Sequence, residues 1–109
     1  MTEFRYSRAL RTAGLTYEIQ GMIYFSLVNA DKQSRGFRRL VKAICAEIAK
    51  DDYMGLYRYL TDKTVNHNYI AMNYYIPVAK LFLWKRLAFI RMYDYIRGKK
   101  PNKTTASQT

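Results

Sequence analysis

The chain has 109 residues, half of them hydrophobic and a quarter charged, which is the size and composition of one globular domain with a modest core. Nineteen Lys and Arg against eight Asp and Glu give a formal net charge of +11, so a polyanionic partner is favoured, nucleic acid first and an anionic membrane surface second. A single cysteine excludes an internal disulfide framework and a cysteine-rich zinc site.

The N-terminal part of the chain has the apolar spacing of helices. We expect a short helix over residues 3–13 that ends at Gly14. A second helix follows Thr16, which is a suitable N-cap residue. It carries no charge from residue 19 to residue 30, so most of its circumference should be buried.

Residues 34–50, SRGFRRLVKAICAEIAK, form the third predicted helix, with Asp31 or Ser34 as its cap. Five apolar side chains share one face of this helix: Phe37, Leu40, Val41, Ile44 and Ile48. Cys45 falls near that apolar side, and cysteine is usually buried, so we expect a core thiol.

Two acidic residues, Asp51 and Asp52, suit the start of a fourth helix, because carboxylates are favourable at a helix N-terminus. The expected apolar stripe of this helix consists of Tyr53, Leu56, Tyr57 and Leu60. The stripe predicts packing on one side only.

The longest helical segment runs from about residue 69 to residue 97. Pro77 interrupts it, which predicts a kink or two helices meeting there, and Gly98 closes it as a C-cap. The fold expected is therefore all-α, a single bundle of four to six helices over residues 1–98. A flexible basic tail is expected at residues 99–109, which have almost nothing to bury.

Few residues of this chain could support catalysis. The lone histidine, His67, lies in a polar connection without a neighbouring serine, and such a residue is usually exposed or structural. The carboxylates are scattered and the five glycines lie singly, so neither a metal cluster nor a phosphate-binding glycine loop is predicted. We expect no enzymatic activity, no cofactor, no metal and no small-molecule substrate.

A basic face on the third predicted helix is more informative. Arg35, Arg38, Arg39 and Lys42 occupy positions i, i+3, i+4 and i+7, so they are neighbours. They repel one another, and the helix dipole disfavours cations in the first turns. A solvated outer face would explain the four cations simply. Their unfavourable placement instead favours contacts with phosphate groups.

The last predicted helix carries a second basic set, Arg86, Arg91 and Arg97. Aromatic residues near cations can stack on unpaired bases or form a protein interface, and the candidates are Trp84, Tyr93 and Tyr57. Their helical spacing is equally that of core residues. Apolar residues surround this helix on all sides, so we expect assembly with other subunits or self-association.

In general character the chain resembles the small helical subunit of CRISPR ribonucleoprotein effector complexes. The basic face on residues 34–50, the apolar final helix and the lack of catalytic residues carry this resemblance, which concerns architecture only. It implies a subunit in antiviral defence that assembles side by side with others and binds the target or displaced strand through Lys and Arg. Small phage and mobile-element proteins share the same traits.

The function expected is sequence-independent binding of a nucleic-acid backbone, DNA or RNA, by a non-catalytic subunit of a larger assembly. The alternative is an interaction protein, such as a phage or mobile-element inhibitor of a host enzyme, without direct nucleic-acid binding. No signal peptide or membrane span is evident, and the longest uncharged stretch, residues 64–79, is too short and too polar to cross a bilayer. We therefore expect a cytoplasmic protein without a membrane partner.

Overall fold

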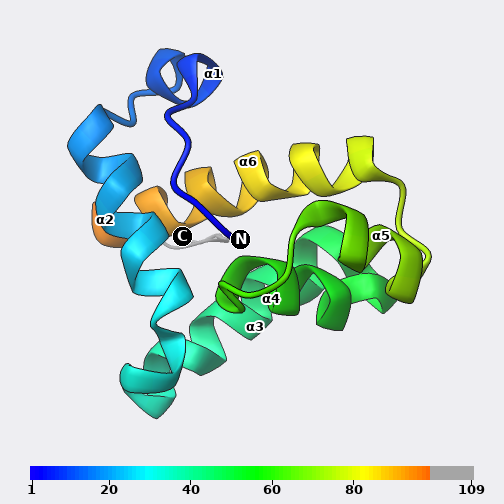
Figure 1. Cartoon of the computed structure of the whole chain (residues 1–109). Helices are drawn as coiled ribbons and strands as arrows, with labels where there is room; N and C mark the ends of the chain where they lie inside the picture. The colour runs from blue at the N-terminus through cyan, green and yellow to red at the C-terminus, as the bar shows by residue number, and fades with distance from the viewer. Residues whose placement is uncertain (99–109) are drawn as a thin grey trace.

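The computed structural model describes residues 1–98, which form helices and connecting loops without a strand (Figure 1). Six α-helices follow in chain order: α1 (Arg8–Thr12), α2 (Tyr17–Val28), α3 (Arg35–Ala49), α4 (Tyr53–Thr61), α5 (His67–Tyr74) and α6 (Val78–Ile96). Two short 3-10 helices, η1 (Ala30–Lys32) and η2 (Lys50–Asp52), precede α3 and α4. The predicted all-α bundle is confirmed, and the predicted basic tail lies outside the described residues.

The last helix, α6, is the centre of the bundle. It contacts each of the other five α-helices, with α2 beside its C-terminal part and α5 beside its start (Figure 1). Four of its residues are buried in the core, Leu81, Ala88, Phe89 and Met92. Ala88 and Phe89 lie two helical turns after Leu81, and Met92 lies one further turn on, so all four share one side of α6.

Pro77 separates α5 from α6, so the predicted interruption is two helices rather than a kink. Tyr75 takes a left-handed conformation (φ 56°) after α5, and Ile76 then inserts its side chain into the core. Gly98 has φ +81° and donates its N–H to the carbonyl oxygen of Tyr95 at 3.0 Å. The C-cap of α6 is Arg97, so the predicted C-cap at Gly98 is one residue too late, and the glycine supplies the left-handed turn that follows the cap.

Side-chain caps begin four of the helices. Ser7, Thr16, Ser34 and Asn66 each accept a hydrogen bond from a backbone N–H in the first turn that follows. Thr16 is confirmed as the cap of α2, and Ser34 caps α3. Asp52 holds the N-cap position of α4, but its side chain accepts no capping hydrogen bond.

The predicted helix over residues 3–13 is wrong in its first half, because the chain is irregular up to Ser7. The cause is Gln20, a fully buried side chain on α2. Its amide accepts a hydrogen bond from the Ser7 N–H at 2.8 Å and donates to the carbonyl oxygens of Ser7 at 3.0 Å and Leu15 at 2.9 Å. These bonds satisfy backbone groups that a helix would otherwise have used.

Two predicted burial patterns also need correction. On α2, Met22 and Phe25 are 48 % and 59 % exposed, because the small bundle covers that helix on one side only. On α4, Tyr53 is exposed and Tyr59 is buried instead, because α4 packs against α2, α3, α5 and α6 rather than against one neighbour. The predicted core position of Cys45 is confirmed: it is fully buried, and burial raises the pKa of its thiol to about 12.

Gly55 allows α4 to approach the end of α5 closely. A Cβ atom at this position would lie 2.7 Å from Cδ1 of Ile76 and 3.1 Å from Cβ of Tyr74. We expect Gly55→Ala to lower the free energy of unfolding by about 1 kcal/mol, because an overpacking cost of up to about 3 kcal/mol exceeds the helix-propensity gain of about 1 kcal/mol. Chemical denaturation measures this change.

Gly36→Ala is the matched control, because the nearest atom to a Cβ there is Oγ of Ser34 at 3.8 Å. We expect its stability to be unchanged or slightly raised. Equal effects of the two substitutions would contradict the close approach of α4 to the end of α5.

Candidate nucleic-acid interface

The outer surface of α3 carries cations that face solvent. Arg35, Arg39 and Lys42 are exposed, and none of them forms an ion pair within residues 1–98. We call these three residues the α3 cationic face. Gly36 and Ala43 are also exposed on this helix and are small, so a flat ligand can come close to its backbone.

The start of α3 adds hydrogen-bond donors to this face. Oγ of Ser34 accepts the N–H of Phe37 at 3.1 Å. The N–H groups of Arg35 and Gly36 make no hydrogen bond within the described part of the chain. Free N–H groups and the positive end of the helix dipole favour an anion at this end of α3.

Arg38, the fourth residue of the predicted set, is engaged inside the protein. Its Nη1 donates to the carbonyl oxygen of Gln33 at 2.6 Å and to that of Ala30 at 3.3 Å. The side chain is half-buried and joins α3 to the end of η1. The structure therefore brings three of the four predicted cations together on the exposed surface.

Lys42 lies over the ring of Tyr57, with 5.3 Å from Nζ to the ring centroid. That ring is half-buried against the core, and burial raises the pKa of the Tyr57 hydroxyl. Tyr57 therefore makes a cation–π contact with Lys42. Its ring is not an open face for the base stacking that the sequence predicted.

The second predicted basic set is not gathered into one surface. Arg86 is exposed, whereas Arg91 pairs with Glu47 at 2.5 Å and Arg97 pairs with Asp94 at 3.0 Å. Both ion pairs neutralise arginines that the sequence analysis predicted to contact phosphate groups.

Two aromatic residues of α6 that were candidates for base stacking pack against the core instead. Trp84 and Tyr93 are partly buried there. Lys80 lies 5.8 Å from the ring centroid of Trp84, and Arg97 lies 4.6 Å from that of Tyr93. Neither ring is an open stacking platform, so the exposed cations of α3 are the stronger candidates for ligand contacts.

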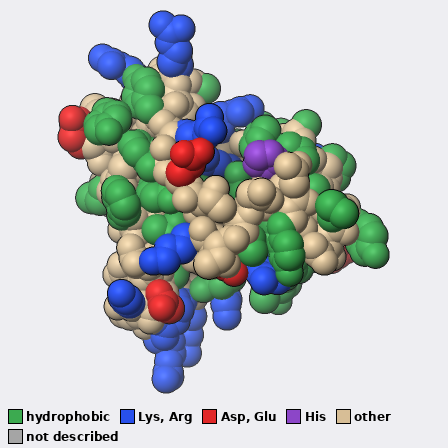
Figure 2. Space-filling view, viewed as in Figure 1, with side chains coloured by type: hydrophobic (Ala, Val, Ile, Leu, Met, Phe, Trp, Pro, Cys, Tyr) green, Lys and Arg blue, Asp and Glu red, His purple; other side chains and the backbone are tan. Residues whose placement is uncertain are grey.

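A space-filling view shows Lys and Arg side chains gathered at the lower end of the molecule, where η1 and the start of α3 lie (Figures 1 and 2). Within residues 1–98 the ion pairs are Arg5–Glu3, Arg58–Asp62, Arg91–Glu47 and Arg97–Asp94. These pairs lie outside the α3 cationic face. Its positive charge is therefore left for solvent or for a ligand.

Sequence reasoning missed a cavity between the N-terminal segment, α4, α5 and α6. It is lined by Arg5, Tyr59, His67, Phe82 and Lys85 among others. Arg5 reaches the cavity from the irregular segment that sequence reasoning had assigned to a helix. His67, expected to be exposed or structural, is half-buried with its ring 4.9 Å from that of Phe82.

Together these features define a small, basic, all-α protein with an exposed cationic helix face. In comparisons with known proteins, no family model, no curated protein and no solved structure matches this chain. None of the helices within residues 1–98 is long and apolar enough to cross a membrane. The same residues contain no group of three His, Cys, Asp or Glu placed to hold a metal ion.

Arg38 and Arg39 are adjacent in sequence but differ in their contacts, which can be tested. We expect Arg38→Met to lower the free energy of unfolding by about 1 kcal/mol, because charged hydrogen bonds to two carbonyl oxygens are lost. Arg39→Met should change it by less than about 0.5 kcal/mol, as exposed substitutions usually do. Urea denaturation of both variants measures the difference, and equal stabilities would contradict an anchoring role for Arg38.

Proposed function

We propose that this protein binds the phosphate backbone of nucleic acid through the α3 cationic face, without sequence preference, as a non-catalytic subunit of a larger assembly. One observation carries the proposal: Arg35, Arg39 and Lys42 are exposed together along the first half of α3 and have no acidic partner within residues 1–98. The N–H groups of Arg35 and Gly36 at the start of the same helix also have no partner among these residues. A helix optimised for its own stability would place acids there.

The dimensions of this face suit a backbone. Seven residues separate Arg35 from Lys42, which is about 10 Å along the helix axis. That length matches the rise along the duplex axis of about three phosphates of one strand, at about 3.4 Å of helix axis each. Guanidinium and ammonium groups position a backbone but read no base edge by themselves, so binding without sequence preference follows.

Assembly with other subunits is supported by apolar side chains that the bundle leaves uncovered on α6. Phe82, Leu83 and Leu87 are each at least 39 % exposed. Exposed apolar residues on neighbouring turns are typical of protein–protein contacts. A CRISPR ribonucleoprotein complex acting in antiviral defence in the cytoplasm is the candidate assembly, on the architectural resemblance described above.

The second candidate function is that of an interaction protein that inhibits a host enzyme and does not touch nucleic acid. An apolar groove of about 270 Å³ between α2, α3 and α6 favours it, with Met22, Phe37, Leu40, Met92 and Ile96 among its walls. Such a groove suits an apolar segment of a partner protein.

Salt dependence of binding tests the first proposal. We expect a variant with Arg35, Arg39 and Lys42 all replaced by Ala to bind nucleic acid more weakly. The slope of log K against log salt concentration should become shallower by about 2 to 3 units, because about three phosphate contacts are lost. Fluorescence anisotropy with single- and double-stranded oligonucleotides measures this slope.

A charge-matched control replaces Arg8, Lys63 and Lys80 by Ala, which removes three exposed cations from α1, from the loop between α4 and α5, and from α6. Its slope should change by less than one unit. Equal changes in the two triple variants would show that binding is diffuse and would refute the α3 cationic face. If the unmodified protein binds neither nucleic acid at low salt, the interaction-protein candidate replaces the proposal.

A further inference from the structure

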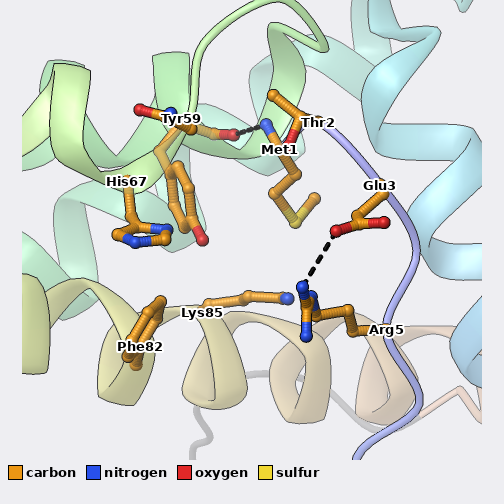
Figure 3. Close-up of a pocket in the computed structure, with 9 residues that line it drawn as sticks. Met1, Thr2, Glu3, Arg5, Tyr59, His67, Phe82 and Lys85 are labelled. Carbon is orange, nitrogen blue, oxygen red and sulfur yellow. Dashed lines mark hydrogen bonds and ion pairs between the residues drawn. The ribbon is translucent and has the colours of Figure 1, made fainter.

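The cavity beneath the N-terminal segment has the features of a small-anion site. Its volume is about 580 Å³, and its walls come from the N-terminal segment, α4, the start of α5 and α6. Figure 3 shows Lys85 extending along α6 until its ammonium group lies beside the guanidinium group of Arg5. Two cations from segments far apart in the sequence thus converge on one space.

The charges in this cavity are poorly compensated. Glu3 pairs with Arg5 at 2.9 Å, but Lys85 forms no ion pair within residues 1–98. Burial and then the neighbouring Arg5 lower the pKa of Lys85, so its positive charge is costly to hold at this position. A bound anion would offset that cost.

The hydroxyl group of a largely buried tyrosine points into the same space. Tyr59 is only 4 % exposed, and its hydroxyl makes no hydrogen bond to another residue of the described chain. In Figure 3 the ring of Tyr59 lies between Met1 and His67 and carries its hydroxyl toward Lys85. This hydroxyl is open to the cavity, so it can donate a hydrogen bond to an oxygen atom of a ligand bound there.

The first turn of α5 forms another wall of the cavity, at Asn66 and His67. Oδ1 of Asn66 accepts the N–H of Tyr69, while the N–H groups of His67 and Asn68 have no partner within residues 1–98. The positive end of the α5 dipole adds to the attraction for an anion. The nitrogen of Met1 is already engaged, since it donates to the carbonyl oxygens of Tyr59 and Asp62.

We propose that this cavity binds a phosphate monoester group, with Lys85 and Arg5 as its cationic contacts and the Tyr59 hydroxyl as a hydrogen-bond donor. Two cations and a hydroxyl match a doubly charged group with three terminal oxygen atoms better than they match a single carboxylate. The ring of Phe82, which also lines the cavity, gives the rest of the ligand an apolar surface.

A phosphate monoester can come from a free small molecule or from the end of a nucleic-acid strand. Four probes separate these sources. Inorganic phosphate and adenosine 5′-monophosphate represent free small molecules, and two forms of one oligonucleotide, with a 5′-phosphate or a 5′-hydroxyl group, represent the end of a strand. Isothermal titration calorimetry on the full chain measures each affinity. Adenosine serves as the uncharged reference and should not bind.

Tyr59→Phe removes only the hydroxyl group, and Lys85→Met removes only the charge. We expect each to weaken binding of adenosine 5′-monophosphate by about tenfold, because each removes a hydrogen bond to a charged group. The matched controls are Tyr24→Phe, on another buried tyrosine, and Lys80→Met, on an exposed lysine of α6. Both controls should bind like the unmodified protein.

Glu3→Gln is a gain-of-binding test, because Glu3 competes with the ligand for Arg5. We expect about two- to fivefold tighter binding of the same nucleotide, the usual effect of one exposed charge. Glu18→Gln, at an exposed acid of α2, should leave the affinity unchanged. Because Glu3 is exposed, this variant should keep its fold even if Lys85→Met does not.

The proposal is overturned if neither inorganic phosphate nor the nucleotide binds at millimolar concentration, or if the control variants weaken binding as much as the site variants. It does not rest on the α3 cationic face. The triple variant of that face should bind the nucleotide normally, and Tyr59→Phe should keep the salt slope for an unphosphorylated strand. The failure of one proposal is therefore distinguishable from the failure of the other.

Discussion

The packing of α6 against all five other α-helices is the contact on which the rest of the structure depends. Its buried stripe runs from Leu81 to Met92, while Phe82, Leu83 and Leu87 remain exposed. Cations that flank this stripe cannot all reach open water. Lys85 is therefore held at the wall of a cavity, and Arg91 is largely buried against α3, where it meets Glu47. The position of α6 thus decides which of its charges are neutralised and which are left without a partner.

The shortage of carboxylates leaves many Lys and Arg side chains without an acidic partner. Eight acids cannot neutralise nineteen Lys and Arg, so the bundle keeps unpaired cations, and it keeps them in two different settings. Those of α3 are exposed, where salt screens them strongly and a long polyanion can release many counterions. The cavity beside Lys85 is partly enclosed, and screening there is weaker. An extended backbone suits the first setting, and a compact anion suits the second.

Local patterns in the sequence predicted much of the fold. Thr16 as a cap, the break at Pro77 and the buried side of α3 that holds Cys45 depend on spacing along one segment, and all three are confirmed. The irregular N-terminal segment was not predictable in this way. It depends on Gln20, thirteen residues further along the chain, whose amide takes over the backbone groups of Ser7. Helical periodicity carries no information about such a contact.

The same limit applies to both candidate sites. Helical spacing places Arg38 beside Arg39, but only the position of the carbonyl oxygens of Ala30 and Gln33 decides that Arg38 is used internally. Arg39 has no ion-pair partner within residues 1–98. The cavity combines Arg5, Tyr59 and Lys85, which share no sequence motif. Arg5 precedes Tyr59 by 54 positions, and Tyr59 precedes Lys85 by 26. Sequence patterns find groups that lie on one helix. A site built from three elements can be recognised only in the folded structure, where the packing of α6 brings those elements together. The sequence shows which residue types are present but not how they pack, and it therefore predicted no small-molecule ligand.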